Sequence, residues 1–367
     1  MYILVINSGS ATLKFKIFDA KNMKDTVWGA IERIGLPKSF LVIENNKGKS
    51  KFDYPAGVKT HALALKTLFH HLPVTPNQLA VIGHRVVHGG EEFTKPTIVN
   101  KKVLGRLKKY NKLAPLHNPV NIAGIEACLK ILPGVRNVAV FDTAYYRTLP
   151  SHAFVYPLPY SFYEREGIRR YGFHGISHEY VALEAAKRLR RPLKKLKIIT
   201  CHLGSGASIT ATKFGQAIDT SMGFTPLEGL EMSTRTGDLD PAIPLYLIRT
   251  LKYRPEEVDN ILNKKSGLLG LTGKMDMREV LVAAKKGNRR AELAVKIFVY
   301  RAQKYIGAYS AIMGGVDAIV FTAGIGERSE TIRKMILKDL GIPGRVKALV
   351  IPTNEELMIA KKAFNLI

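Results

Sequence analysis

Hydrogen-bond donors are concentrated in one short stretch near the N-terminus, VINSGSATLKFKIFD at residues 5–19. Its polar side chains include Asn7, Ser10, Thr12 and Lys14. Thr12 and Lys14 share one face because side chains alternate along a strand, and Gly9 permits close approach of the backbone. Donors and a cation around a tight turn are suited to binding an anion such as phosphate, although an ordinary hairpin with a polar turn is the alternative. The P-loop spacing GxxxxGK[ST] is absent.

Two apolar runs end in groups that could bind a metal or a phosphorylated ligand. Asp142 closes the run VRNVAVFD, and TAGIGE places two glycines before Glu327. Ligands of open α/β sheets bind at the carboxyl ends of the strands. Asp142 there could hold Mg²⁺ or orient a nucleophile, or it could simply cap a turn. Glu327 is a second metal candidate.

Histidines and arginines stand beside glycine where other strands become loops. The segments are GHRVVHGG, YGFHGISH, CHLGSG and MSTRTGDLDP. HGISH lacks the glutamate of the HExxH pattern, so a zinc site is not expected. Arg85 and Arg235 could bind planar anions with two hydrogen bonds each, although a surface salt bridge is the commoner role of a single arginine. Together these groups favour stabilisation of a charged transition state.

Alternating apolar patterns predict the elements that carry these residues. Strands are expected at Tyr2–Ile6, Leu13–Ile17, Leu79–Val87, Val135–Asp142, Leu196–Leu203, Ser208–Lys213 and Val316–Thr322. Helices are expected at Gly57–Leu72, Val99–Leu113, Ile122–Ile131, Ser177–Arg190, Asp240–Leu251, Pro255–Asn263, Asp276–Ala284 and Ala291–Met313. Residues 115–119 are expected to form a loop and 323–327 a glycine turn. The strand–turn–strand pattern at residues 5–19 recurs in IITCHLGSGASITATKF, which indicates two α/β domains of related design.

Length and composition limit the class of protein. A chain of 367 residues is too long for one ordinary core, so two domains are expected. The net charge of +26 suggests either nucleic-acid binding or a solvated basic surface that attracts small anions, and the absence of an aromatic-interleaved RNA signature favours the second. Two cysteines, no apolar run of transmembrane length and no signal peptide point to a cytoplasmic protein without membrane contact.

Taken together, the motifs resemble those of the acetate kinases along essentially the whole chain. In order they are NSGSATLKFKIFD, GHRVVHGG, PLHNP, FDTA, YGFHGISHEYV, HLGSGAS, MGFTPLEGL, TRTGDLDP, SGLLG, TAGIGE and VIPTNEEL. The resemblance implies two actin-like (ribonuclease H-like) α/β domains with the active site in the cleft between them. Residues 1–145 with 353–367 would form the first domain, and 146–352 the second, which carries the nucleotide site and the probable dimer interface.

The resemblance also implies a reaction and a set of roles. The family transfers the γ-phosphoryl group of ATP to a short carboxylate, reversibly, with Mg²⁺ (or Mn²⁺). Arg85, Asp142, His174 and Arg235 would be catalytic, with His174 and Arg235 stabilising the transition state. Arg85 would also bind the substrate beside a small apolar pocket of Val87, Leu116, Phe173 and Pro226. The phosphates and nucleotide would contact Ser10, Thr12, Lys14, His117, His202, Gly204, Ser205, Gly206, Asp276, Met277, Arg278, Gly324, Ile325 and Gly326. Asn7 and Glu327 would hold the metal, and a homodimer is implied.

Some choices remain open at this point. Ser205, Tyr146 and Ser233 stand where the family usually has other residues, so the nucleotide preference is not fixed by the sequence. One methylene in the substrate pocket is worth only about 1–3 kcal/mol, so propionate is the nearest alternative to acetate. An alternative of another class is a non-catalytic actin-like ATPase or a nucleic-acid-binding protein. The presence of Arg85, Asp142, His174 and Arg235 together argues against it.

Overall fold

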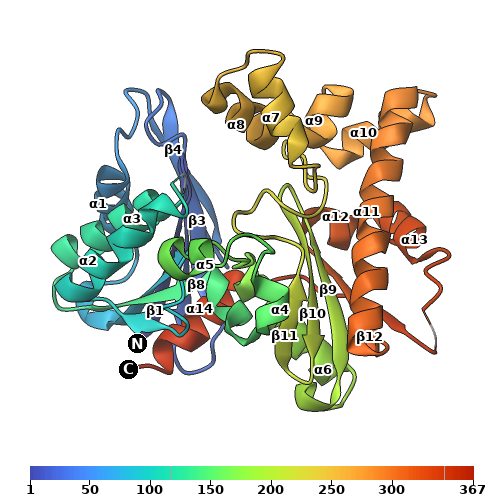
Figure 1. Ribbon diagram of the computed structural model, residues 1–367. Coiled ribbons are helices and arrows are strands. Elements are labelled where there is room, and N and C mark those ends of the chain that lie inside the picture. The colour runs from blue at the N-terminus through green and yellow to red at the C-terminus, as the bar shows by residue number, and fades with distance from the viewer. Residues whose placement is uncertain (116, 343) are drawn as a thin grey trace. The chain divides into compact units, whose positions relative to one another are not determined.

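The computed structural model describes residues 1–115, 117–342 and 344–367 (Figure 1). The chain divides into two compact units. Unit 1 comprises Met1–Arg147 and Asn354–Ile367, and unit 2 comprises Thr148–Thr353. The predicted substrate-pocket residue Leu116 lies outside the described residues.

Unit 1 is built on one sheet whose described strands follow the order β5-β4-β3-β2-β1-β6-β8-β7. The strands are β1 (Tyr2–Ser8), β2 (Thr12–Asp19), β3 (Asp25–Glu32), β4 (Ser39–Asn45), β5 (Gly48–Tyr54), β6 (Leu79–Val86), β7 (Thr97–Ile98) and β8 (Arg136–Phe141). The first five form an antiparallel meander, whereas β6 and β8 run parallel to β1. The carboxyl ends of β1, β6 and β8 therefore lie at one edge of the sheet.

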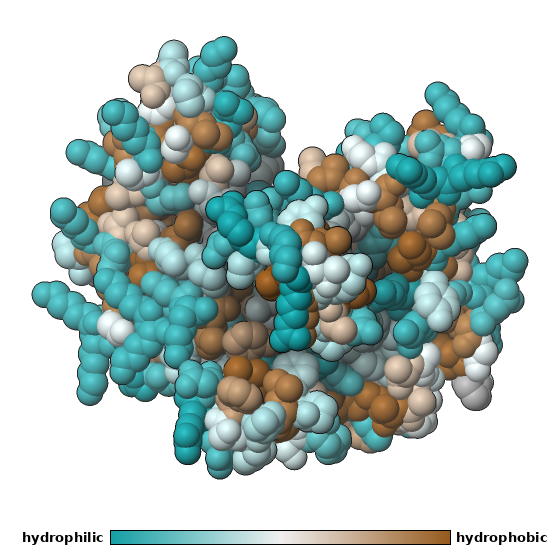
Figure 2. Space-filling view, turned by 45° about the horizontal axis from the view of Figure 1, so that its top comes forward, coloured by the Kyte–Doolittle hydropathy of each residue, from teal (hydrophilic) through white to brown (hydrophobic). Residues whose placement is uncertain are grey.

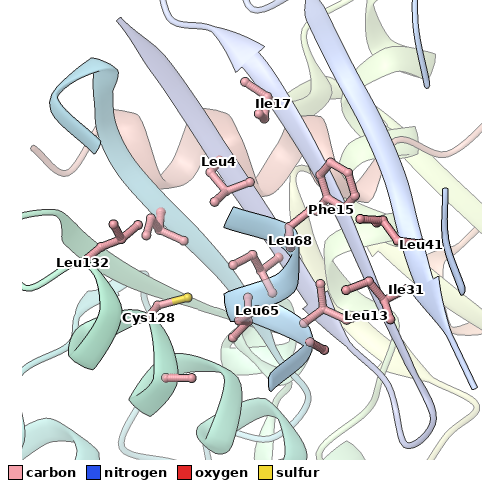
Figure 3. Packing of buried hydrophobic residues seen from close by; sticks show 14 of the residues in the cluster. Leu4, Leu13, Phe15, Ile17, Ile31, Leu41, Leu65, Leu68, Cys128 and Leu132 are labelled. Carbon is pink, nitrogen blue, oxygen red and sulfur yellow. The ribbon is translucent and has the colours of Figure 1, made fainter. Parts of the chain in front are cut away.

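Helices cover both faces of this sheet. They are α1 (His61–His71), α2 (Lys101–Lys108), α3 (Asn118–Ile131) and α14 (Glu355–Phe364). Leu65 and Leu68 of α1 and Cys128 of α3 pack with Leu4 and Leu13 in the main core of unit 1 (Figure 3). Ile82 joins that core, so the next residue along β6 faces the opposite side. There Gly83 allows α14 to pack closely, since an added Cβ would lie 2.7 Å from Cγ2 of Ile359.

Unit 2 has a second sheet whose described strands follow the order β11-β10-β9-β12-β13. These are β9 (Lys197–Leu203), β10 (Ala207–Lys213), β11 (Gln216–Thr220), β12 (Ala318–Thr322) and β13 (Lys347–Val350). The helices are α4 (Ser151–Phe154), α5 (Ser161–Glu166), α6 (Gly175–Arg188), α7 (Ala242–Arg249), α8 (Pro255–Lys264), α9 (Gly267–Thr272), α10 (Met277–Lys285), α11 (Arg289–Met313), α12 (Ala323–Arg328) and α13 (Glu330–Leu337). Val181 and Ala185 of α6 pack against Ile198 and Val320 of the sheet.

The predicted strands and most predicted helices are present, with three differences. The helix expected at Val99–Leu113 is split into α2 and a 3₁₀ turn at Lys109–Lys112. The expected loop at residues 115–119 already contains the first turn of α3, because proline is tolerated there. The expected glycine turn at 323–327 is the short helix α12. None of the helices in the described residues combines the length and the hydropathy that crossing a bilayer requires.

Candidate active site

The turn between β1 and β2 is held in one conformation by hydrogen bonds from two other elements. The Gly9 amide donates to the Thr12 carbonyl at 2.8 Å, and the ring Nε2 of His61 lies 2.7 Å from the Gly9 carbonyl oxygen. Asn121 of α3 donates its side-chain N–H to the Ser8 carbonyl at 2.8 Å. Ser10 remains exposed at the tip of this fixed turn. The predicted donors at this turn therefore sit on a preorganised backbone.

The polar residues of the turn differ in exposure. Asn7 pairs with Lys14 across the β1–β2 register, so the two lie at the same end of the hairpin. Lys14 is exposed, whereas Asn7 and Thr12 are half-buried. An exposed ammonium group beside half-buried donors can bind an anion without a large desolvation cost.

Arg85 and Asp142 meet at the carboxyl ends of β6 and β8. Arg85 Nη2 donates to Asp142 Oδ2 at 2.6 Å, and its Nε lies 3.2–3.3 Å from the two carboxylate oxygens. Burial lowers the pKa of Arg85, but the carboxylates of Asp142 and Glu355 outweigh this effect and raise it overall. The structure thus joins two residues that the sequence identified 57 positions apart.

Glu355 was missed by the sequence-based assignment of roles, although its motif VIPTNEEL contributed to the resemblance. It is the first residue of α14, and its Oε2 lies 3.8 Å from Arg85 Nη1. Burial raises the pKa of Glu355 to about 7, and the neighbouring carboxylates add to this effect while Arg85 opposes it. Acidic residues are common in the first turn of a helix because they interact favourably with the helix dipole. Glu355 and Glu356 fit that common pattern, so the sequence alone does not indicate that Glu355 contacts Arg85.

Asn121 is a second residue that the sequence did not indicate. Besides binding the Ser8 carbonyl, its side-chain oxygen accepts the Val87 N–H at 3.1 Å. It therefore connects the turn after β1 to the segment that follows β6. The predicted pocket residue Val87 is buried there, with 7% of its surface exposed. His117, which stands just before α3, is half-buried.

In unit 2 a second glycine turn joins β9 to β10. The Gly204 amide donates to the Gly206 carbonyl at 3.0 Å, and the Ser233 amide donates to the Ser205 carbonyl at 3.1 Å. A Cβ added to Gly206 would lie 3.3 Å from His174 Nε2 and 3.7 Å from Arg235 Nη1. An imidazole and a guanidinium therefore converge on the backbone of this turn, as phosphoryl recognition requires.

The rings of His174 and His202 are stacked with their centroids 4.2 Å apart. Each ring is oriented through its Nδ1: His174 by the hydroxyl of Ser208 at 2.9 Å, and His202 by the hydroxyl of Ser177 at 2.8 Å. His174 also has a positive φ of 58°, which a non-glycine residue rarely adopts outside functional or strained sites. The Nε2 atoms lie close to the Gly204–Gly206 turn: a Cβ added to Gly206 would lie 3.3 Å from that of His174, and one added to Gly204 would lie 3.8 Å from that of His202.

Arg235 has no carboxylate counterion in the part of the chain that the structure describes. Its Nη1 donates to the Pro226 carbonyl at 3.3 Å. Burial alone lowers its pKa. This contact brings together Arg235 and Pro226, both of which were predicted to belong to the site. Phe173, another residue of the predicted substrate pocket, is buried and directly precedes His174 in the chain. A guanidinium in such surroundings favours binding of an anion.

A cavity of about 770 Å³ in unit 2 is lined by most of the predicted phosphate and nucleotide residues that belong to this unit. These are Gly204, Ser205, Asp276, Met277, Arg278, Gly324 and Ile325. Met275 and Leu281 add apolar lining that the sequence did not indicate, and Ser233 also lines the cavity. Gly206 and Gly326 are not among the lining residues. Gly326 is buried, and an added Cβ would lie 3.4 Å from the backbone of Phe321.

Glu327 has a structural function within unit 2. Its Oε1 accepts hydrogen bonds from the amides of Ala323 at 2.8 Å and Thr353 at 3.2 Å. It therefore holds the start of α12 and the end of the unit. Within the described residues, no three carboxylate, imidazole or thiol side chains converge as a protein-only metal site would need.

Comparison with known proteins gives a consistent result. Residues 2–345 match the sequence model of the Acetokinase family. The chain is 48% identical to an acetate kinase of Dictyoglomus thermophilum, over 100% of this chain and 99% of that one. It superposes on the crystal structure of Porphyromonas gingivalis acetate kinase with a TM-score of 0.92 and 39% identity, covering 100% of this chain and 99% of that one. A propionate kinase from Francisella tularensis gives a TM-score of 0.94 and 40% identity, over 100% of both chains. The predicted family resemblance and the predicted α/β fold class are confirmed.

Proposed function

Since the chain belongs to the acetokinase family, we propose that it transfers the γ-phosphoryl group of ATP to acetate, reversibly, giving acetyl phosphate and ADP. A carboxylate is already a nucleophile, so this reaction needs no strong base. Catalysis then consists of positioning the two substrates and neutralising charge on the transferring group.

The observation that carries this proposal is the unpaired guanidinium of Arg235 beside His174 at the Gly204–Gly206 turn. Arg235 is half-buried and has no carboxylate partner among the described residues, so a ligand that supplies negative charge is favoured there. The transferring phosphoryl group would supply it, with Arg235 and His174 donating to its oxygens. The adjoining cavity of about 770 Å³ would hold the nucleotide between Met275, Met277 and Ile325.

The residues of unit 1 are assigned to the carboxylate and the phosphate chain. Arg85 would bind the carboxylate of the substrate with the part of its fork that Asp142 does not occupy. Asp142 would act by fixing that guanidinium next to the reacting oxygen. Ser10, Thr12 and Lys14 would bind phosphate oxygens at the preorganised turn, and His117 and His202 would line the phosphate path. Transfer requires that both sets of residues act on one phosphoryl group.

Magnesium is assigned to a small number of protein oxygens. Mg²⁺ in kinases is usually bound by one or two carboxylates together with substrate phosphates and water, so a three-residue cluster is not needed. Glu355 fits because it is a buried carboxylate whose charge is only partly neutralised by Arg85, and Lys14, its electrostatic neighbour, pairs with Asn7. We assign Asn7 and Glu355 as the main candidate ligands of Mg²⁺. Glu327 is a third candidate, which would bind through its Oε2 because its Oε1 accepts hydrogen bonds from the amides of Ala323 and Thr353. The ion would neutralise phosphate charge during transfer.

Acetate is proposed over propionate because the similar proteins of Dictyoglomus thermophilum, Halothermothrix orenii and Caldicellulosiruptor saccharolyticus are acetate kinases. The pocket assigned to the methyl group comprises Val87, Leu116, Phe173 and Pro226. The similar propionate kinase structure makes propionate the second candidate. The ratio of the kcat/KM values for the two acids decides between them.

A homodimer and a cytoplasmic location also belong to the proposal. Large apolar side chains are exposed on unit 2, among them Leu158, Tyr160, Phe162, Leu245, Tyr246 and Tyr253. Such side chains are typical of a subunit interface. Long hydrophilic side chains project over much of the face in Figure 2, in line with a solvated basic surface rather than one partner-specific patch. Both cysteines are free and buried, as in a reducing compartment.

The test is a hydroxamate assay with ATP, Mg²⁺ and acetate, propionate or butyrate. We expect acyl phosphate from acetate, and a fall in kcat of at least ~100-fold in Arg235→Ala and in Asp142→Asn. Arg254→Ala is a matched control, because that arginine is exposed and forms its ion pair with Glu257 of the same helix. Absence of acyl phosphate from all three acids would refute the proposal. Steeply salt-dependent nucleic-acid binding in that case would favour the alternative class.

A further inference from the structure

His178 is a buried histidine to which the proposed reaction gives no role. Its side chain is fully buried, with Nδ1 2.6 Å from Thr200 Oγ1 and Nε2 2.8 Å from Ser208 Oγ. The same Ser208 oxygen lies 2.9 Å from Nδ1 of His174. A continuous row of hydrogen bonds therefore leads from Thr200 on β9 through His178 and Ser208 to His174. Burial, with a smaller effect from His202, lowers the pKa of His178, so its ring is neutral.

One proton on Ser208 couples the two histidines. A hydroxyl group donates one hydrogen bond, so Ser208 donates to one ring and accepts from the other. If it donates to His174, Nδ1 of His174 is unprotonated and its neutral ring carries the proton on Nε2. If it donates to His178, the neutral ring of His174 carries its proton on Nδ1, and Nε2 cannot donate.

The hydrogen bonds of Thr200, at the far end of the row from His174, decide between these two donor–acceptor orders. In the first, the Thr200 hydroxyl donates to His178 Nδ1, His178 Nε2–H donates to Ser208, and Ser208 donates to His174. Each of these donors then has an acceptor at 2.6–2.9 Å. In the second, Thr200 must accept from His178 and can donate only to the Thr210 carbonyl at 3.5 Å. A buried donor with so long a bond is poorly satisfied, so the first order is favoured.

We propose that Thr200, His178 and Ser208 form a relay that fixes the proton of neutral His174 on Nε2, so that this nitrogen donates a hydrogen bond to the phosphoryl group. Thr200, His178 and Ser208 are positioning residues in this scheme. The identity of the acceptor rests on the proposed function, whereas the tautomer does not. His174 Nε2 faces the place beside Gly206 that Arg235 Nη1 also faces.

The tautomer is measured in the unmodified protein, labelled with ¹⁵N-histidine, by long-range ¹H–¹⁵N correlation. His174→Gln and His178→Gln assign the two rings by loss of their signals. We expect both neutral rings to carry the proton on Nε2. A proton on Nδ1 of His174 would overturn the proposal. This result does not depend on which carboxylate the enzyme uses, or on whether it uses one.

A double-mutant cycle separates positioning from stability. Ser208→Ala should lower kcat about 10-fold with little change in the KM for ATP, as expected when the supporting partner of an active histidine is lost. In a His174→Ala background the same substitution should have no further effect on kcat. Thr220→Val is the matched control: it removes a buried hydroxyl of β11 that contacts the Thr210 hydroxyl and the Ile209 carbonyl, and kcat should be retained. An equal effect of Ser208→Ala in both backgrounds would overturn the proposal.

Discussion

The guanidinium of Arg85 holds the carboxylate of Asp142 at the ends of two neighbouring parallel strands, with 2.6 Å between Nη2 and Oδ2. Asp142 is 1% exposed, so its carboxylate is shielded from water and the guanidinium is its ion-pair partner. Arg85→Ala should lower the free energy of unfolding by about 2–3 kcal/mol, below the full value for a buried pair because the arginine is partly exposed. Urea denaturation measures this loss.

The matched variant for this pair is Arg85→Ala combined with Asp142→Asn. Removing both charges leaves no carboxylate at position 142 without a partner, although Glu355 still loses its contact with Arg85, so the double variant should lose less stability than the sum of the two single variants. Strict additivity in urea denaturation would mean that the two side chains do not interact in solution.

A substitution of Gly206 tests the proposed phosphoryl site by filling space, without changing any charge. Gly206→Ala would place a methyl group 3.3 Å from His174 Nε2, in the space assigned to a phosphoryl oxygen. A small shift of the neighbours accommodates it, so Tm should change by no more than ~2 °C, while kcat/KM for ATP should fall at least ~10-fold.

The control for this prediction is Gly105→Ala in the exposed helix α2. An added Cβ there meets nothing within 4 Å, and alanine favours a helix by about 0.5–1 kcal/mol. Activity should be retained and stability unchanged or slightly higher. Full activity in Gly206→Ala would show that the phosphoryl group does not occupy this space.

The sequence predicted the strands that end in functional residues, because their apolar runs and glycine turns are local signals. It did not predict β3 to β5, whose outer members carry many polar side chains such as Lys49, Lys51 and Asp53. Pro119 was read as part of a loop, because position in the first helical turn cannot be told from a loop by residue type alone.

The site itself was only partly readable from the chain. Arg85, Asp142, His174 and Arg235 stood out because each follows a conspicuous local pattern or lies in a family motif. Glu355 and Asn121 act across 270 and 34 positions, through contacts with Arg85 and Val87 that no local pattern encodes. The relay behind His174 likewise depends on the pairing of β9 with β10, which places Ser208 and Thr200 on either side of His178.

A substitution of Val87 tests the proposed substrate pocket. Val87 is buried and follows Arg85 by two residues in the chain. Val87→Ala removes two methyl groups from the proposed acyl pocket. The ratio of kcat/KM for propionate to that for acetate should rise about 10-fold, the usual worth of one methylene. Val86→Ala is the matched control, because Val86 packs in the core behind the strand, and the ratio should not change. An unchanged ratio in Val87→Ala would remove Val87 from the pocket.

Glu231 makes the stability of unit 2 depend on pH. It is 2% exposed, and neither carboxyl oxygen has a hydrogen-bond partner among the described residues. Burial raises the pKa of Glu231 from 4.5 to about 8, against the opposing effect of Arg301. Between these pH values the folded chain binds a proton that the unfolded chain does not. The contribution of Glu231 to stability is therefore complete below pH 4.5 and falls as the pH rises toward 8, by several kcal/mol at most.

Glu231→Gln keeps the shape of this side chain and removes its titration. The free energy of unfolding, measured with urea at pH 5, 6.5 and 8, should fall with pH more steeply in the unmodified protein than in the variant. The difference between the two proteins isolates Glu231 from the histidines, which titrate in both. At pH 8 the variant should be the more stable, since it carries no buried charge. Parallel pH profiles would show that the carboxyl group of Glu231 is solvated or paired in solution.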